Sequence, residues 1–308
     1  MSSKNIIEVN NLSKSFGKRK VIDDIGFSVK EGDIYGFLGQ NGSGKTTTIR
    51  MLLNLIHPDT GEIKLNSFDL KKDFFNAIKE VGAVVEIPKF YSYLSGRKNL
   101  LLIANLIHGI DDFRVNEVLE MVGLINRSDE KVKTYSLGMM QRLGIANALL
   151  SNPKLVILDE PTNGLDPQGM KEIRNIILNL ASEKNITFFI STHMLHEVEQ
   201  ICNKVAILHQ GKIITEGLVN ELLNIDLESV EIHTPHFNKV IDLTKNLKYI
   251  RSVERFEKGV KLKLERGFCA ELNRFLISNN IDVEYIIPRT QSLESYFINM
   301  TGGDNNLA

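Results

Sequence analysis

Apolar and polar residues alternate along the first part of the chain, which predicts β-strands. The alternation covers residues 6–16 and 21–29, with the period of two that a half-buried strand requires. A short apolar run at 34–38 also predicts a strand and leads directly into a glycine-rich stretch. Residues 44–56 then have helical character, which ends before Pro58 because proline cannot continue a helix. The expected order is strands, a glycine-rich loop and a helix.

The periodicity changes between residues 95 and 124, where apolar residues recur at helical spacing. Two helical faces are expected there, formed by Leu100, Ile103, Ala104 and Ile107 and by Val115, Val118, Leu119 and Val122. Beyond them, fully apolar runs at 155–158 and 188–190 alternate with helical stretches at 167–181 and 195–202. Such alternation predicts an α/β fold with a parallel sheet covered on both faces.

The pattern of strands and helices starts again in the last part of the chain. Over residues 230–287 the expected order is βαββαβ, which is ferredoxin-like, and a final helix is expected near 293–300. We therefore expect two domains. The first is an α/β domain over 1–224 with an inserted helical subdomain at about 87–151, and the second is a small α+β domain over 225–308.

Composition excludes several classes of protein. The 37 basic and 38 acidic side chains nearly cancel, so no general field would attract nucleic acid, and we expect no nucleic-acid partner. Cys202 and Cys269 have neither zinc-ligand spacing nor a disulfide framework, which is typical of a reducing compartment. No run approaches the roughly 18 apolar residues of a membrane helix, and residues 1–10 lack the pattern of a signal peptide. A cytoplasmic protein is expected.

The glycine-rich stretch fits the phosphate-binding P-loop pattern. Its residues are Gly39, Gln40, Asn41, Gly42, Ser43, Gly44, Lys45 and Thr46, followed by Thr47. Backbone N–H groups of such a loop and the helix N-terminus behind it bind phosphate, so we expect all nine residues to bind ATP. Lys45 should reach the β- and γ-phosphates, and the Thr46 hydroxyl should bind Mg²⁺. An ordinary strand-to-helix turn is the alternative, and the flanking strand and helix argue against it.

Two carboxylates, Asp159 and Glu160, follow the apolar strand at 155–158. Ligands bind at the carboxyl ends of strands in open α/β sheets. We expect Asp159 to hold Mg²⁺, directly or through water, and Glu160 to polarise the attacking water. An apolar strand that ends in Asp-Glu is common by itself, but its position after a P-loop favours the catalytic interpretation.

A third motif lies before that strand and reads Tyr135-Ser136-Leu137-Gly138-Met139-Met140-Gln141-Arg142. Ser136 is a good N-cap, and alone the run would indicate only a capped amphipathic helix. Together with the P-loop it resembles the signature of the ABC ATPase family, usually Leu-Ser-Gly-Gly-Gln. Ser136 and Gly138 keep the serine and the second glycine, whereas Met139 replaces the glutamine. The resemblance covers roughly residues 5–217.

The resemblance implies further site residues. Asn163-Gly164-Leu165-Asp166 matches the D-loop, which adds Asp166 to the ATP-binding residues. His193 matches the switch histidine that contacts the γ-phosphate and assists catalysis, and Phe16 stands where an aromatic ring stacks on adenine. A structural histidine and a core phenylalanine are the competing interpretations.

Glu86 stands where most of the family has a glutamine that links the Mg²⁺ site to the helical subdomain. The resemblance implies that Glu86 joins Thr46 and Asp159 around Mg²⁺, and a solvated loop charge is the alternative. The acidic replacement, the third motif and the tail at 292–297 resemble the branch that exports bacitracin and lantibiotic-type peptides.

The resemblance thus implies an ATPase subunit that powers export of a peptide antibiotic or similar amphipathic compound through separate membrane permeases. Two copies would close head to tail around two ATP molecules, on the cytoplasmic face of the membrane, and the helical insert would move the permease. The alternatives are a soluble ABC ATPase of translation or DNA repair, and a P-loop GTPase or small-molecule kinase. Asn203-Lys204-Val205-Ala206 lacks the aspartate of a guanine-binding motif.

Overall fold

The computed structural model describes residues 4–223 and 227–289. The chain divides after Leu218 into two compact units, which are described separately. The division expected at 224/225, the helix expected near 293–300 and the tail at 292–297 lie outside the described residues. Within the described ranges, every helix is too short or too polar to cross a lipid bilayer.

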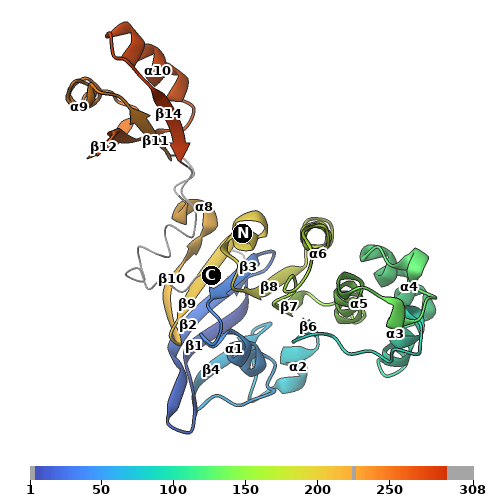
Figure 1. Ribbon diagram of the computed structural model, residues 1–308. Helices are drawn as coiled ribbons and strands as arrows, with labels where there is room; N and C mark the ends of the chain where they lie inside the picture. Colours follow the sequence, from blue (N-terminus) through green and yellow to red (C-terminus); the bar gives the residue numbers. More distant parts are fainter. Residues whose placement is uncertain (1–3, 224–226, 290–308) are drawn as a thin grey trace. The chain divides into compact units, whose positions relative to one another are not determined.

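The first unit contains a six-stranded sheet in the order β10-β9-β3-β8-β7-β6 (Figure 1). Its strands are β3 (Ile34–Gly39), β6 (Val81–Val84), β7 (Leu155–Asp159), β8 (Thr187–Thr192), β9 (Lys204–His209) and β10 (Lys212–Leu218). All neighbouring pairs are parallel except β9 and β10. Every residue of β3, β7 and β8 is buried, which explains their apolar runs. The carboxyl ends of these strands meet at one edge of the sheet.

A second, antiparallel sheet in this unit has the order β2-β1-β4-β5. Its strands are β1 (Asn5–Phe16), β2 (Arg19–Lys30), β4 (Thr60–Leu65) and β5 (Phe68–Asp69). The core between the sheets includes four aromatic rings, from Phe27, Tyr35, Phe37 and Phe189, whose neighbouring centroids lie 5.3–5.8 Å apart. This packing fixes the long β1–β2 hairpin against the sheet that carries the P-loop.

Helix α1 (Lys45–Leu52) follows the P-loop and is shorter than the predicted helix over 44–56. Asn54 adopts a left-handed conformation with φ 57°. The N–H groups of Asn54 and Leu55 donate to the carbonyls of Met51 and Arg50, at 3.0 and 2.8 Å. This is a Schellman motif, which satisfies the last carbonyls of a helix and ends it. The helix therefore stops at Leu52, before Pro58 could act.

The remaining helices of the first unit include the predicted inserted subdomain (Figure 1). They are α2 (Phe74–Ile78), α3 (Gly96–Ala104), α4 (Asp112–Met121), α5 (Leu137–Leu149), α6 (Pro167–Lys184), α7 (Leu195–Ile201) and the 3₁₀ turns Ile125–Arg127 and Val132–Thr134. The face predicted from Val115 to Val122 is fully buried. Ile107 lies beyond the end of α3, so the first predicted face was one position too long.

The second unit has α8 (Val219–Leu222) and then the element order βαββαβ that the sequence predicts. The elements are β11 (Leu227–His233), α9 (Phe237–Thr244), β12 (Ile250–Phe256), β13 (Gly259–Glu265), α10 (Cys269–Ser278) and β14 (Tyr285–Arg289). The strands form one antiparallel sheet in the order β12-β13-β11-β14. Buried residues alternate along β13 at Val260, Leu262 and Leu264, and they form a separate core.

Candidate functional site

The P-loop lies between the end of β3 and the start of α1, and its glycines are required by its shape. Gly42 and Gly44 have φ values of 77° and 115°, which side chains with a Cβ rarely adopt. A Cβ on Gly39 would lie 2.6 Å from the Leu208 carbonyl oxygen and from Ser43 Oγ. The backbone therefore turns tightly in front of the α1 N-terminus, where the helix dipole favours an anion.

Lys45 is the first residue of α1, directly after this loop, and is only 5% exposed. Its Nζ donates to the carbonyl oxygens of Gly39 and Gln40, at 2.7 and 3.2 Å, and pairs with Glu160 Oε1 at 3.1 Å. The lysine thus joins the P-loop directly to the carboxylates at the end of β7. A buried ammonium group held by carbonyls and a carboxylate is positioned to bind phosphate oxygens.

Asp159 is the last residue of β7 and is 6% exposed. Its Oδ2 accepts a hydrogen bond from Thr46 Oγ1 at 2.9 Å, and its Oδ1 accepts one from Ser191 Oγ at 2.5 Å. Mg²⁺ takes oxygen ligands and usually only one or two carboxylates beside phosphates and water. The Thr46 hydroxyl and the Asp159 carboxylate therefore fit the expected metal.

Glu160 has a left-handed backbone conformation, with φ 50°. Its N–H donates to Ser191 Oγ and to the Ser191 carbonyl oxygen, both at 3.1 Å. Its Oε2 lies 2.7 Å from His193 Nδ1, while Oε1 pairs with Lys45. The carboxylate is held between a lysine and a histidine at the carboxyl edge of the sheet. Sequence reasoning named His193 but assigned no role to Ser191, whose only signal was its position in the strand before His193.

A hollow of about 350 Å³ opens beside the P-loop. Its lining residues are Phe16, Arg19, Val21, Asn41, Gly42, Gly44, Lys45, Thr46, Thr47, Glu160 and Asn163. The Phe16 ring is 52% exposed, which contradicts the core interpretation, and Lys14 Nζ lies 5.6 Å from its centroid. Arg19 and Val21 were missed because they lie on β2, outside any motif.

The signature and the D-loop are adjacent to each other. Ser136 caps α5, where its Oγ accepts the Met139 N–H at 3.2 Å, and Asp166 caps α6, where its Oδ1 accepts the Gly169 N–H at 3.1 Å. A Cβ on Gly138 would lie 3.8 Å from Leu165 of the D-loop. Apart from Asn163 of the D-loop, the residues of these two motifs do not line the hollow beside the P-loop. Ser136 is exposed, whereas the Met139 side chain is buried, so the Met139 side chain faces the protein interior.

Glu86 is an exposed residue that forms an ion pair with Arg50 of α1. The same arginine donates a hydrogen bond to Oε1 of Glu86, so Glu86 is not simply a solvated loop charge. Among the described residues no three His, Cys, Asp or Glu side chains gather as a metal cluster. In this structure Glu86 contacts Arg50, while Thr46 contacts Asp159.

Comparison with known proteins decides the family. Residues 22–163 match the ABC transporter family. The bacitracin transport ATP-binding protein BcrA of Bacillus licheniformis is 44% identical over 97% of this chain and 98% of its own length. The chain belongs to the ABC transporter ATP-binding proteins. The P-loop GTPase and kinase alternatives are thereby excluded.

Further similar proteins are also named as ATP-binding parts of transport systems. The lantibiotic transport ATP-binding protein SrtF of Streptococcus pyogenes is 37% identical, over 68% of this chain and 90% of its own. The structure of MJ1267 in its ADP conformation, an ATP-binding cassette of an ABC transporter, has a TM-score of 0.64 at 27% identity, and covers 71% of this chain and 93% of that one. These are transport subunits, which contradicts the alternative of translation or repair. The ABC cassette fold is confirmed.

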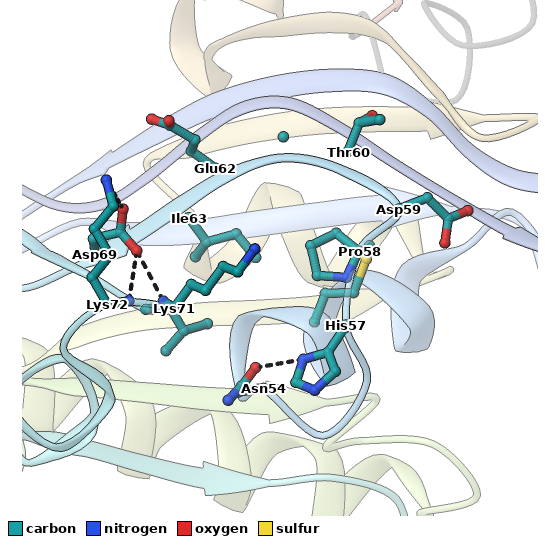
Figure 2. A pocket seen from close by; sticks show the side chains of 13 residues that line it. Asn54, His57, Pro58, Asp59, Thr60, Glu62, Ile63, Asp69, Lys71 and Lys72 are labelled. Carbon is teal, nitrogen blue, oxygen red and sulfur yellow. Dashed lines mark hydrogen bonds and ion pairs between the residues drawn. The ribbon is translucent and has the colours of Figure 1, made fainter.

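This ABC protein has a second hollow, of about 530 Å³, beyond the other end of α1 (Figure 2). Asn54 and His57 form one side, where His57 Nδ1 lies 3.1 Å from Asn54 Oδ1. On another side, Asp69 accepts the N–H groups of Lys71 and Lys72 at 2.9 and 3.0 Å. Because this hollow lies at the C-terminal end of α1, the helix dipole there disfavours a phosphate. The smaller hollow beside the P-loop is therefore the candidate nucleotide site.

Proposed function

We propose that this chain binds and hydrolyses ATP to power an ABC exporter. One observation carries the proposal: Lys45, Thr46, Asp159, Glu160 and His193 are joined by direct contacts at one edge of the sheet. When ATP binds, phosphate oxygens would replace the loop carbonyl oxygens as the hydrogen-bond partners of Lys45 Nζ. Thr46 and Asp159 would hold Mg²⁺, which when bound neutralises charge on the β- and γ-phosphates.

In this proposal, Glu160 orients and polarises the attacking water. Its contact with Lys45 holds the carboxylate beside the P-loop, and His193 contacts its second oxygen. Phe16, exposed at the rim of the same hollow, offers its ring to adenine. Asn41 and Thr47 also line this hollow.

A second copy of the chain is proposed as the partner that completes each site. What supports this is the position of the signature: Ser136 caps an exposed helix N-terminus that lies outside its own nucleotide hollow. Such an N-terminus binds anions. A head-to-tail dimer would bring Ser136, Gly138 and the backbone at Met139 to the γ-phosphate of the facing copy, and Asp166 to the interface.

Membrane permeases are proposed as the other partners, which places the chain on the cytoplasmic face of the membrane. The helical subdomain exposes large apolar side chains, Ile87, Tyr91, Tyr93, Leu102 and Leu106. Exposed apolar patches mark protein contacts. Because relatives are named for transport of bacitracin and lantibiotics, we propose a peptide antibiotic or a similar amphipathic compound as substrate. The second unit would be an accessory domain outside the ATP site.

The proposal is tested with Glu160→Gln in the purified subunit and in its complex with permease. We expect ATP binding to persist, turnover to fall by orders of magnitude and an ATP-bound dimer to accumulate, because an amide keeps the shape without the charge. Glu183→Gln, on the exposed face of α6, is the matched control. Near-normal turnover of Glu160→Gln would reject the catalytic role, and absence of ATP binding by the unaltered protein would reject the function.

The substrate is tested separately in cells. Deletion of the gene should raise sensitivity to a bacitracin- or lantibiotic-type peptide, and restoring the protein should reverse it. Unchanged sensitivity to such peptides, with ATP hydrolysis intact, would reject the substrate class but not the ATPase.

A further inference from the structure

Arg50 lies in the last turn of α1, and its Nη2 pairs with Oε1 of Glu86. Glu86 follows β6 by two residues, on the same edge of the sheet as the P-loop. The side chains are 43% and 61% exposed. No sequence motif gives a role to Arg50, and the proposed ATP chemistry does not use it.

A parallel contact lies one helical turn away. Thr46 precedes Arg50 by four residues, so both side chains lie on the same face of α1. Thr46 contacts Asp159 at the end of β7, which pairs in parallel with β6. Two neighbouring strands therefore each direct one carboxylate to α1: Asp159 to the proposed metal ligand, and Glu86 to a guanidinium group one turn further on.

The backbone at Glu86 adopts an uncommon conformation. Its φ of 62° lies in the left-handed region, which is uncommon for residues other than glycine. Pro88 follows two residues later and restricts Ile87 to extended conformations. An ion pair between exposed side chains is weak, so this contact can be exchanged for another cation.

We propose that Arg50 is a positioning residue that holds Glu86 one helical turn from Thr46 and Asp159, and that it competes with the divalent cation for the Glu86 carboxylate. The inference rests on the proposed function, because it requires that Thr46 and Asp159 bind the cation. Two carboxylates repel unless a cation lies near them. Arg50 supplies that positive charge while Glu86 is away from Asp159.

The experiment uses electron paramagnetic resonance to follow Mn²⁺ binding to the full chain in the presence of a non-hydrolysable ATP analogue. The measured quantity is the Mn²⁺ concentration that half-saturates the protein. Arg50→Met releases Glu86 and should lower the half-saturating Mn²⁺ concentration by about two- to fivefold, as expected from the strength of an exposed ion pair. Arg50→Lys keeps the charge and should remain near the unaltered protein. Arg50→Gln is a second neutral variant, and thermal unfolding checks that each variant is folded.

The deciding comparison uses Glu86→Gln as background. If Arg50 acts through Glu86, then Arg50→Met together with Glu86→Gln should match Glu86→Gln alone. The inference is overturned if Arg50→Met causes no shift, or if it causes the same shift in the Glu86→Gln background. The latter would mean that the guanidinium field acts directly on the cation. If the unaltered chain binds no Mn²⁺ with nucleotide, the proposed function fails as well.

Discussion

Ser191 donates a 2.5 Å hydrogen bond from its hydroxyl to Oδ1 of Asp159, across the paired strands β8 and β7. The two residues are directly opposite in register, and Ser191 is fully buried. The same hydroxyl accepts the Glu160 N–H. One buried side chain therefore fixes the position of both acidic residues of the site.

We expect Ser191→Ala to impair turnover while leaving the fold intact. A hydrogen bond to a charged group contributes about 1.5–3 kcal/mol, so the rate should fall by about ten- to a hundredfold. Steady-state ATP hydrolysis at saturating Mg²⁺ measures it. Ser182→Ala, whose exposed hydroxyl donates to an α6 carbonyl at 3.2 Å, is the control. A normal rate in Ser191→Ala would show that Asp159 is positioned without Ser191.

Lys45→Ala should weaken nucleotide binding itself. The substitution removes a buried ammonium group that faces the P-loop. The loss of a charge-assisted contact predicts a rise in the Kd for ATP of about tenfold or more. Equilibrium titration with a fluorescent ATP analogue measures this, and the exposed Lys79→Ala is the control. Unchanged affinity in Lys45→Ala would contradict the assignment.

Substitutions at Glu86 should separate coupling from binding. Glu86→Gln should disturb the link between transport and hydrolysis more than it disturbs ATP affinity. Glu86→Ala should impair transport most, because the alanine side chain has no polar atom. Cell survival in a peptide antibiotic, with protein amounts matched by immunoblot, measures the effect. Glu120→Ala, on the exposed face of α4, is the control. Normal survival with Glu86→Ala would show that this residue has no coupling role.

A chain that ends after Leu218 should still bind ATP. The first unit contains the P-loop, both carboxylates and all residues that line the nucleotide hollow. The second unit has its own hydrophobic core, so we expect the first unit to stay folded when the second unit is removed. Calorimetric titration of the purified fragment checks this. A folded fragment without ATP affinity would mean that the second unit contributes to the site.

Several elements follow from local chemistry, which explains why the sequence predicts them well. Glycines at 42 and 44 are needed where φ is positive, and the apolar run of β7 is needed where both faces are covered. The end of α1 was predicted wrongly. Asn54 stops the helix through its left-handed backbone, and a single asparagine is a weaker stop signal than Pro58.

The sequence by itself determined which chemical groups are available: a P-loop with a lysine and a threonine hydroxyl, and two carboxylates and a histidine at strand ends. Only the tertiary structure decided how these groups are paired. Ser191 reaches Asp159, His193 reaches Glu160, and Arg50 takes the carboxylate of Glu86. Each pair joins segments distant in sequence. Their meeting depends on strand order, register and the placement of α1 over the sheet, which arise from packing of the whole core and which no local pattern encodes.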